Sequence, residues 1–356
     1  MEKLREYTVG ELVMNFDRLR KPLSSREREK RKGPYPYYGA ACVFDYVDDY
    51  LFDGDYILLG EDGTVINEDG TPVLQRISGK TWVNNHAHVL RNSEIIDFDY
   101  LYYALKNSNF TSAVTGAVQP KISQANMNSV KILIHVEKEE QKKIARVLKM
   151  LDDKIEANAQ INNNLFEQAQ ALYTSMFITN ADPSWQQGRL SDLITVRYGK
   201  DHKKLADGVY PVYGSGGIMR YAERPLYEHE SVLIPRKGTL NNVMYVNEPF
   251  WSVDTMFYTE MRVPNVAKFV YHFVKSKDLA SMNAGSAVPS MTTDILNAME
   301  LAIPSELALA QFENLVAPMY RAMKANDIQT AQLINLRDSI LPKLMSGELD
   351  VSAIEI

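Results

Sequence analysis

The sequence is poor in the residues that form covalent cross-links, zinc clusters and membrane anchors. Its 356 residues include one cysteine, Cys42, which excludes an intramolecular disulfide and a cysteine-based zinc cluster. No apolar run near the amino terminus has the character of a signal peptide or a membrane span. We therefore expect a cytoplasmic protein with no membrane partner.

Motifs of catalytic sites are also missing. The segment SGKT at Ser78 resembles the end of a phosphate-binding loop, but the glycine required five residues before Gly79 is replaced by Leu74. The glycines of YGSGGIM lack the strand and helix context of a dinucleotide site. An Asn-Pro-Pro-aromatic sequence, as used by amino-methylating enzymes, is absent too. We expect no catalytic residue and no cofactor site, so that any methyl transfer belongs to a partner.

Two histidines, His86 and His88, would share one face of a strand and could ligate a metal ion. No third or fourth ligand is evident from the sequence. A turn or strand role is therefore favoured over zinc, with DNA contact as a third alternative, and no metal site is predicted.

The chain has enough hydrophobic residues to form folded cores, and two of its segments have the pattern of long helices. Hydrophobic residues make up 45 % of it, and the net charge of −6 does not preclude local basic clusters. In Glu137–Phe177 and in Ala310–Met345, seam residues recur at alternating steps of four and three, which predicts two coiled-coil helices. The first seam is Ile144, Leu148, Leu151, Ile155, Asn158, Asn162, Leu165, Ala169, Leu172 and Met176; the second is Phe312, Val316, Met319, Met323, Asn326, Thr330, Leu333, Arg337, Ile340 and Leu344.

The regions outside these helices form an internal repeat of mixed strand and helix character. YPYYGAA at Tyr35 matches YPVYGSG at Tyr210, and GEDGT at Gly60 matches PRKGT at Pro235, both at an offset of 175. At an offset of 169, the repeat pairs Trp82 with Trp251, YLYYALK with FVYHFVK, GAVQPKIS with GSAVPSMT, and KILIHV with ELAIPS. The predicted order is globule, helix, globule, helix.

These segments together resemble the specificity subunit of type I restriction-modification systems, over nearly the whole chain. The most specific stretches are YILLGEDGTV, WVNNHAHVLR, VLIPRKGTLNNVMYVNEPFWSVDT, GAVQPKIS, EEQKKIARVLKMLDDKIEANAQIN and LRDSILPKLMSGELDV. Two features depart from the family pattern: His135 and Val136 replace a proline-rich lead into the first helix, and the linker after that helix is short.

The resemblance implies an α+β fold, with two duplicated mixed α/β target-recognition domains separated by two long helices that form an antiparallel intramolecular coiled coil. The expected boundaries are 1–136 for the first recognition domain, 137–178 for the first helix, 179–304 for the second recognition domain, and 305–356 for the second helix and a short tail. Residues 1–32 are expected to be a polar, charge-rich loop face or a phosphate-contacting segment.

The resemblance also implies a non-catalytic subunit that reads double-stranded DNA, each domain recognising half of a bipartite, asymmetric site. Its partners would be two methyltransferase subunits, which use S-adenosylmethionine to methylate adenine at N6, and restriction motor-nuclease subunits, which use ATP and Mg. The alternative is a non-catalytic coiled-coil adaptor without sequence-specific DNA reading. That alternative does not explain two duplicated globules with dissimilar polar loops.

The duplicated Gly-Thr turns are the sharpest candidates for base reading. One turn presents Glu61 and Asp62, which can accept from base amino groups such as that of cytosine, and the other presents Arg236 and Lys237, which suit guanine O6 and N7. Hairpin charges unrelated to bases remain an alternative. The full set of predicted DNA-binding residues is Arg18, Arg20, Lys21, Arg28, Glu61, Asp62, Thr64, Asn84, Asn85, His86, Gln119, Lys121, Lys200, Lys203, Lys204, Arg220, Arg236, Lys237, Thr239 and Ser290.

The polar centre of the two seams predicts how the helices pair. An antiparallel pair would place Asn158 against Thr330 and Asn162 against Asn326, whereas a parallel pair would match Asn158 with Asn326 equally well. The antiparallel arrangement is favoured because it would space the two recognition domains for a split target. Pro318 is expected to kink the second helix near its start.

Overall fold

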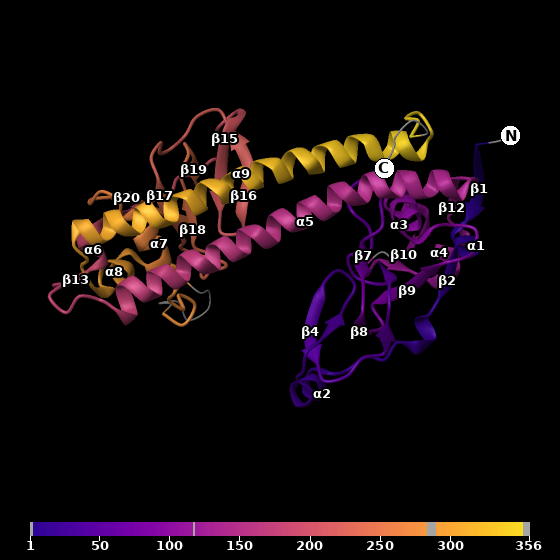
Figure 1. Ribbon diagram of the computed structural model, residues 1–356, viewed down its shortest axis with the longest axis horizontal. Coiled ribbons are helices and arrows are strands. Elements are labelled where there is room, and N and C mark those ends of the chain that lie inside the picture. The colour runs from indigo at the N-terminus through magenta and orange to yellow at the C-terminus, as the bar shows by residue number, and fades with distance from the viewer. Residues whose placement is uncertain (1–2, 117, 283–289, 352–356) are drawn as a thin grey trace. The chain divides into compact units, whose positions relative to one another are not determined.

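The computed structural model describes residues 3–116, 118–282 and 290–351. The chain forms two compact units (Figure 1): unit 1 comprises residues 1–158 and 328–356, and unit 2 comprises residues 159–327. Unit 1 therefore combines segments from both ends of the sequence, while unit 2 is continuous. Two long helices, α5 (Lys138–Thr174) and α9 (Glu306–Met345), each contribute residues to both units.

Unit 1 contains short helices and strands in the order β1 (Leu4–Thr8), α1 (Val9–Leu12), β2 (Val13–Asn15), η1 (Asp17–Leu19), α2 (Ser25–Lys30), β3 (Tyr35–Tyr38), β4 (Val43–Val47), β5 (Phe52–Asp53), β6 (Tyr56–Gly60), β7 (Leu74–Ile77), β8 (Lys80–Val83), β9 (Ala87–Asn92), α3 (Phe98–Lys106), η2 (Thr111–Ala113), β10 (Val114–Thr115), β11 (Lys121–Ile122), α4 (Gln124–Ser129) and β12 (Lys131–His135). Its sheets have the strand orders β2-β9-β6-β7, β4-β3-β8-β5, β1-β12 and β10-β11.

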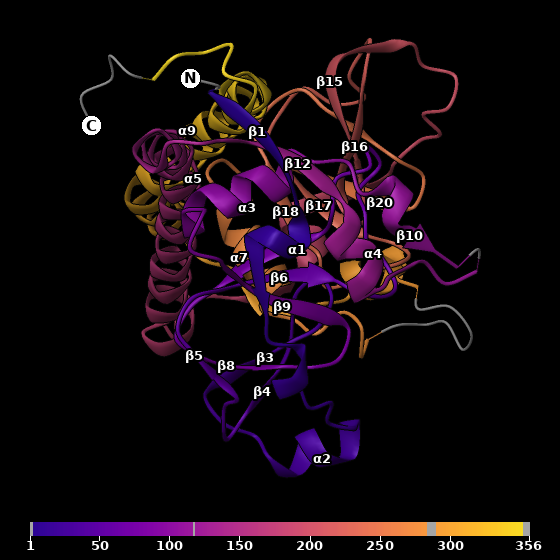
Figure 2. The same cartoon turned by 90° about the vertical axis from the view of Figure 1, so that its right-hand side faces the viewer.

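The layers of unit 1 follow from its apolar pattern. Every residue of β6 is buried, as expected of a central strand covered on both faces. Figure 2 shows α1, α3 and α4 on one side of β6 and β9, with β3, β4, β5 and β8 on the other side and α2 beyond them. Helix α3 begins where the side chain of Asp97 accepts a hydrogen bond from the backbone N–H of Tyr100, and it packs its apolar face into the core.

The expectation of a loop face in residues 1–32 is wrong for much of the described part, residues 3–32, while phosphate contact by this segment stays a prediction. Strand β1 pairs along its whole length with β12, and Val9 and Leu12 of α1 are fully buried. In α2, Ser24 and Glu27 form a capping box, in which each side chain satisfies the backbone N–H of the other residue. Short elements such as β1, α1 and α2 need few apolar residues. Their apolar pattern is therefore hard to detect in a sequence segment that is rich in charge.

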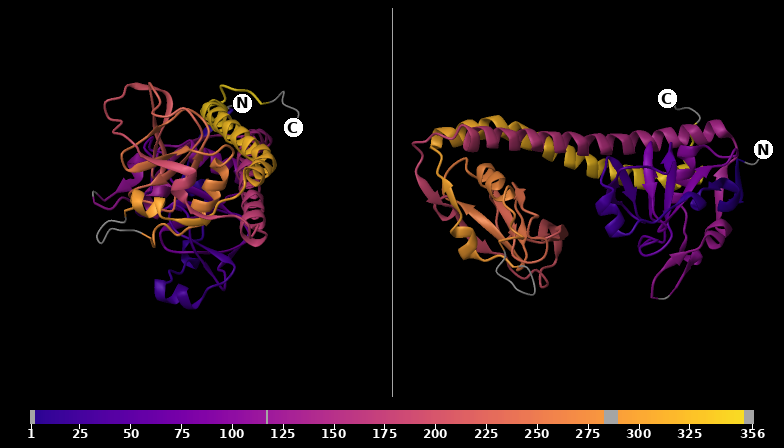
Figure 3. Two further views of the ribbon diagram at one scale, coloured as in Figure 1. Left: turned by 90° about the vertical axis from the view of Figure 1, so that its left-hand side faces the viewer. Right: turned by 90° about the horizontal axis from the view of Figure 1, so that it is seen from below.

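Unit 2 repeats this plan with π-helical turn η3 (Ser175–Thr179), β13 (Gln187–Arg189), α6 (Leu190–Leu193), β14 (Ile194–Tyr198), β15 (Asp207–Gly214), β16 (Gly217–Ala222), β17 (Ser231–Pro235), β18 (Met244–Val246), β19 (Trp251–Ser252), β20 (Met256–Met261), α7 (Ala267–Lys275), α8 (Thr293–Asn297) and β21 (Glu300–Ala302). Its sheets are β14-β20-β17-β18, β16-β15-β19 and β13-β21, drawn in salmon and orange in Figure 3.

The predicted duplication is confirmed down to single contacts. Trp82 pairs in parallel with Tyr37, and Trp251 pairs in parallel with Val212. The indole Nε1 of Trp82 donates to the carbonyl of Lys21 at 2.7 Å, and that of Trp251 donates to the carbonyl of Lys200 at 2.9 Å. The two units are therefore copies of one fold with different surface residues.

The two long helices pair antiparallel, as predicted. In unit 1, the side-chain amide of Asn158 donates to Thr330 Oγ1 at 3.2 Å and to Gln329 Oε1 at 3.0 Å. In unit 2, Asn326 Nδ2 donates to Asn162 Oδ1 at 2.8 Å. Helix α9 continues through Pro318, so the expected kink does not interrupt it.

A polar contact also ties each unit's short helix to both long helices. In unit 1, Asp152 of α5 accepts from Tyr103 of α3 at 2.7 Å and pairs with Arg337 of α9 at 2.7 Å. In unit 2, His272 of α7 bonds with Gln170 of α5 at 2.8 Å and with Tyr320 of α9 at 2.9 Å. Among the described residues, no helix is long and apolar enough to cross a membrane.

Candidate DNA interface

The two predicted recognition turns have the same backbone geometry. The N–H of Glu61 donates to the carbonyl of His86 at 2.8 Å, and the N–H of Arg236 donates to the carbonyl of Thr255 at 2.9 Å. Gly63 and Gly238, two residues further on, both have φ near +84°, a conformation that glycine adopts without strain. The chain thus presents the residues at positions 61 and 236 from equivalent points of the two units.

A second loop closes against each turn in the same way. Asp62 forms a β-bridge with Lys121, and Lys237 forms one with Ser290. These two bridges join GEDGT to GAVQPKIS and PRKGT to GSAVPSMT, the pairs that the repeat aligned. Of the second loop in each pair, residues 117 and 283–289 lie outside the described residues.

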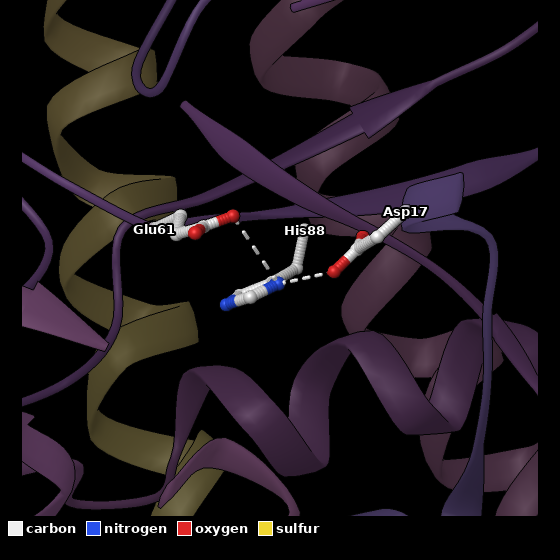
Figure 4. A group of neighbouring side chains, drawn as sticks. All are labelled: Asp17, Glu61 and His88. Atoms are coloured by element: carbon white, nitrogen blue, oxygen red, sulfur yellow. Dashed lines mark hydrogen bonds and ion pairs between the residues drawn. The ribbon is translucent and has the colours of Figure 1, made fainter. Parts of the chain in front are cut away.

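In unit 1, Glu61 belongs to a cluster of charged side chains beneath the turn (Figure 4). His88 Nδ1 lies 2.6 Å from Asp17 Oδ2 and 3.7 Å from Glu61 Oε2. Arg20 donates to Glu61 Oε2 at 2.6 Å, and Lys121 Nζ lies 3.0 Å from Glu61 Oε1. We call Asp17, Arg20, Glu61, His88 and Lys121 the charged cluster.

Both ring nitrogens of His88 are hydrogen-bonded. His88 is almost fully buried, and its Nε2 donates to the carbonyl of Ile122 at 2.8 Å. Its Nδ1 faces the carboxylate of Asp17, so the ring is held between two acceptor groups.

Both carboxylates of the charged cluster have a pKa below the ordinary value. For Asp17, burial acts to raise the pKa, but the hydrogen bond and charge of His88, with bonds from Asn15 and the Val89 backbone, lower it. For Glu61, burial again acts to raise the pKa, but Arg20, Lys121 and His88 together lower it by more. Both groups are therefore ionised near neutral pH.

Asp17, Glu61 and His88 also have the composition of a metal site, because one ligand atom from each lies within 4.8 Å of the others. These carboxylates, distant in sequence, are the further ligand candidates that the histidine spacing alone did not reveal. Arg20 and Lys121 already supply positive charge to Glu61, and both nitrogens of His88 carry hydrogen bonds. The geometry therefore favours an ion-pair cluster over a divalent-metal site.

Several predicted residues of unit 1 gather around Asp62. His86 Nδ1 lies 2.6 Å from Asp62 Oδ1, and the backbone N–H of His86 donates to Asn84 Oδ1 at 2.8 Å. A cavity of about 470 Å³ opens beside them; its lining includes Ser24, Arg28, Tyr37, Phe44, Asp62, Asn84, Asn85 and His86. This cavity brings together five residues that the sequence singled out, from three separate segments: Arg28, Asp62, Asn84, Asn85 and His86.

The turn of unit 2 has a different environment. The guanidinium of Arg236 lies over the ring of Tyr198, 5.3 Å from its centroid, and its NH1 donates to the carbonyl of Asp254 at 3.3 Å. Tyr198 in turn makes an edge-to-face contact with Phe257 at 5.0 Å. Lys237 and Thr239 are exposed.

The remaining predicted DNA-contact residues divide into exposed and internally bonded groups. Exposed side chains are Arg18, Lys21, Thr64, Asn85, Gln119, Lys121, Lys200, Lys203 and Lys204, while Ser290 is half-buried. Arg20, Arg28 and Arg220 are instead bonded within the protein. Arg28 pairs with Asp45 and the carbonyl of Leu23, and Arg220 donates to the carbonyl of Leu205 and pairs with Asp207.

Arg20 and Glu61 are bonded to each other within the protein, and their contact with DNA stays a prediction. Their side chains are only 13 % and 14 % exposed, since each is the partner of the other. The sequence did not single out Asp17, Tyr198 or Phe257. The signal that could have revealed Tyr198 and Phe257 is the strand register, which pairs them. Asp17 lies in η1, beyond the ladder of β2 and β9, and meets His88 only through its side chain.

Comparisons with known proteins agree with this duplicated architecture. The sequence model of the family described as "Type I restriction modification DNA specificity domain" matches residues 1–167 and 183–309. A type I restriction enzyme specificity subunit of Haemophilus influenzae is 26 % identical over 328 residues, which cover 83 % of this chain and 82 % of that protein. The MjaIX specificity subunit of Methanocaldococcus jannaschii is 25 % identical over 301 residues, covering 71 % and 69 %.

A crystal structure of the type I restriction-modification S subunit from M. genitalium shares the fold. Its TM-score is 0.64 at 18 % identity, with 96 % of each chain covered. The fold and its two equivalent turns thus define a duplicated recognition scaffold. With two matched segments covering most of its length, the chain belongs to the type I restriction-modification DNA specificity domain family.

Proposed function

We propose that this chain is the sequence-reading subunit of a type I restriction-modification complex, in which each unit reads one half of a bipartite, asymmetric DNA site. The observation that carries the proposal is the pair of superposable turns with opposite charge. Identical backbone bonds present Glu61 and Asp62 in unit 1 but Arg236 and Lys237 in unit 2. A duplicated scaffold with divergent hydrogen-bonding groups is suited to reading two different base sequences.

The exposed basic residues supply the sequence-independent part of binding. Lys21 and Lys200 occupy equivalent positions, since their carbonyls accept from the equivalent tryptophans Trp82 and Trp251. Together with Arg18, Lys203 and Lys204 they are proposed to contact phosphates and to position each unit on the duplex. Replacement of one such lysine should weaken binding to all sequences and reduce its salt dependence.

Partner subunits carry the chemistry in this proposal. Two methyltransferase subunits, supplied with S-adenosylmethionine, methylate adenine at N6, and restriction motor-nuclease subunits use ATP and Mg. The chain itself contributes the reading surface, and its paired helices α5 and α9 offer exposed faces to the methyltransferase subunits. The family assignment supports this division of labour, because the family is named for DNA specificity.

The competing function is a coiled-coil adaptor that holds partners together without reading DNA. It accounts for α5 and α9 but not for the opposite charges at the equivalent turns. Purified chain, alone and with its methyltransferase partner, should be presented with a library of randomised duplexes. Enrichment of one bipartite sequence by the complex is expected, and retention of all duplexes equally would establish the adaptor.

The direct readout of bases by the turns can be tested by exchange. Methylated sites should be mapped for the wild-type complex and for a variant in which GEDGT and PRKGT are exchanged. Altered half-site sequences are expected. An unchanged recognition sequence would show that the turn charges do not contact bases.

A further inference from the structure

The residues beneath the two turns occupy equivalent positions in the two units. The first residue pair between β2 and β9 is Val13 with Asn92, and that between β14 and β20 is Ile194 with Met261. In unit 2, Tyr198 and Phe257 form the last pair between these two strands. In unit 1 the ladder ends at Asn15 with Leu90, and Asp17, two residues further on in η1, reaches His88 through its side chain. We call these two residues of each unit the support pair.

Each support pair is in contact with its own turn residue. In unit 1, His88 and Asp17 form a hydrogen bond of 2.6 Å, and His88 lies 3.7 Å from the carboxylate of Glu61. In unit 2, Tyr198 lies under the guanidinium of Arg236 at 5.3 Å from the ring centroid. Phe257 holds the ring of Tyr198 in place by an edge-to-face contact.

The chemistry of each support pair matches the charge of its turn residue. The imidazole of His88 and the guanidinium of Arg20 face the carboxylate of Glu61, whereas the negative face of an aromatic ring attracts the guanidinium of Arg236. An exchange of the two turn residues alone would set a guanidinium beside His88 and Arg20, or a carboxylate over the face of Tyr198. Both combinations are repulsive.

The fold itself does not require the charges in unit 1. Unit 2 builds the same strands with an aromatic pair at these positions, and burial of ionised groups is costly unless they are fully paired. The charged support pair, Asp17 and His88, therefore acts on the position of Glu61 more than on the stability of the sheet.

We propose that each turn residue and its support pair act together as one specificity unit. Asp17 and His88 are positioning residues that hold Glu61, and through it the neighbouring Asp62 and its partner His86, in the geometry that reads the first half-site. Tyr198 and Phe257 are positioning residues that hold Arg236 for the second half-site. This inference rests on the proposed function, and it assigns base selectivity to four residues that support the turns: His88 and Phe257 are buried, Asp17 is half-buried and Tyr198 is 52 % exposed.

A double-mutant cycle on the complex with its methyltransferase partners tests the inference. The variants are Glu61→Gln, the support-pair variant Asp17→Tyr with His88→Phe, and all three substitutions combined. The readout is the base preference at each position of methylated sites in a randomised duplex library. The support-pair variant should lose about tenfold of its discrimination at the first half-site, and the second half-site should be unchanged.

The combined variant distinguishes positioning from general stability. If the support pair acts through Glu61, its replacement should have no further effect once Glu61→Gln is present. Additive losses, or equal losses at both half-sites, would overturn the inference. The matched cycle in unit 2 uses Arg236→Gln with Tyr198→Leu, for which only the second half-site should respond.

Two controls keep the outcome interpretable. Asp17→Asn with His88→Gln retains the side-chain shapes, so it should retain the fold, as checked by thermal unfolding, while it loses first-half discrimination. If this folded variant kept full discrimination, the charges would have no positioning role. If the wild-type complex itself showed no base preference, the proposed function would fail instead, which separates the two claims.

Discussion

At the scale of single residues, His272 shows how burial fixes a side chain's protonation state. Its ring stacks between Phe166 and Tyr173, with centroids 5.6 Å and 5.7 Å away, and both of its nitrogens are hydrogen-bonded, to Gln170 and Tyr320. Burial lowers the pKa of His272 from 6.5 to about 4. The ring is therefore neutral in folded unit 2 over a range where the unfolded chain would bind a proton.

This difference predicts that unit 2 loses stability in mild acid. Above pH 6.5 the ring is neutral in both states; as the pH falls towards 4 only the unfolded chain is protonated, so the free energy of unfolding decreases. The shift corresponds to roughly 3 kcal/mol at 1.36 kcal/mol per pH unit. Urea unfolding of the wild type and of His272→Gln at pH 7.5 and 4.5 should show the larger acid loss in the wild type. Parallel losses would contradict this role of His272.

At the scale of elements, the centre of the helix pair is a polar layer in an otherwise apolar seam. Asn158 is fully buried, and its side-chain Nδ2 donates to Gln329 and Thr330 of the opposite helix. A buried asparagine can specify the register of a coiled coil at some cost in stability. The layer thus favours one antiparallel alignment of α5 and α9 over its neighbours.

Replacement of residues in this layer should show how much the layer contributes to stability. Asn158→Ala is expected to lower the free energy of unfolding by about 1–3 kcal/mol, because a buried contact is lost and its partners are left unmatched. Asn158→Leu combined with Thr330→Val should be neutral or stabilising, since apolar residues of similar size tolerate burial. Urea denaturation measures both. The exposed Asn163→Ala is the control, expected to stay within about 0.5 kcal/mol of the wild type.

The elements also show what could be predicted from the sequence and why the rest could not. Strands such as β6 and β17 and helices α3, α7, α5 and α9 were predictable, because their apolar residues recur with one clear period. Strand β1 and helix α2 were missed, since a few buried residues or a single capping box suffice to form them. The charged cluster was missed because strand pairing unites Asp17, Glu61 and His88 from three separate segments.

At the scale of the whole molecule, unit 1 is completed by residues that follow unit 2 in the sequence. Leu341, Leu344, Met345 and Val351 are buried in its core together with residues of β6, α3 and β12. Unit 2 has no such dependence, because residues 159–327 are continuous. The integrity of the first recognition surface therefore depends on the final turns of α9.

A substitution in these turns should consequently act on unit 1. Leu344 is 3 % exposed, and Leu344→Ala should lower the free energy of unfolding by about 2–5 kcal/mol, through lost burial and the cavity that remains. Hydrogen exchange read by mass spectrometry should show faster exchange in β6 and β9 and little change in β17 and β20. Leu336→Ala, at a position 47 % exposed, is the matched control and should leave both units protected.

The length of the paired helices leads to a prediction about the DNA site as a whole. If they act as a ruler between the two recognition surfaces, deletion of one heptad from each shortens them by about 10 Å at 1.5 Å per residue. Methylome sequencing should then find a changed gap between the half-sites, with the half-site sequences intact. A variant that recognised new half-site sequences at the original gap would contradict the ruler hypothesis.

The split composition of unit 1 has a consequence for how the protein is made. As the ribosome synthesises the chain, residues 1–158 emerge first but lack core residues Leu341 to Val351 until almost the whole chain has been translated. Unit 2 can close earlier, since all of its residues are present once residue 327 has emerged. Translation that stops after residue 327 but before Leu341 would thus yield a chain with a finished second half and an unfinished first half. In such a product, the core of unit 1 would lack the residues that the last turns of α9 supply.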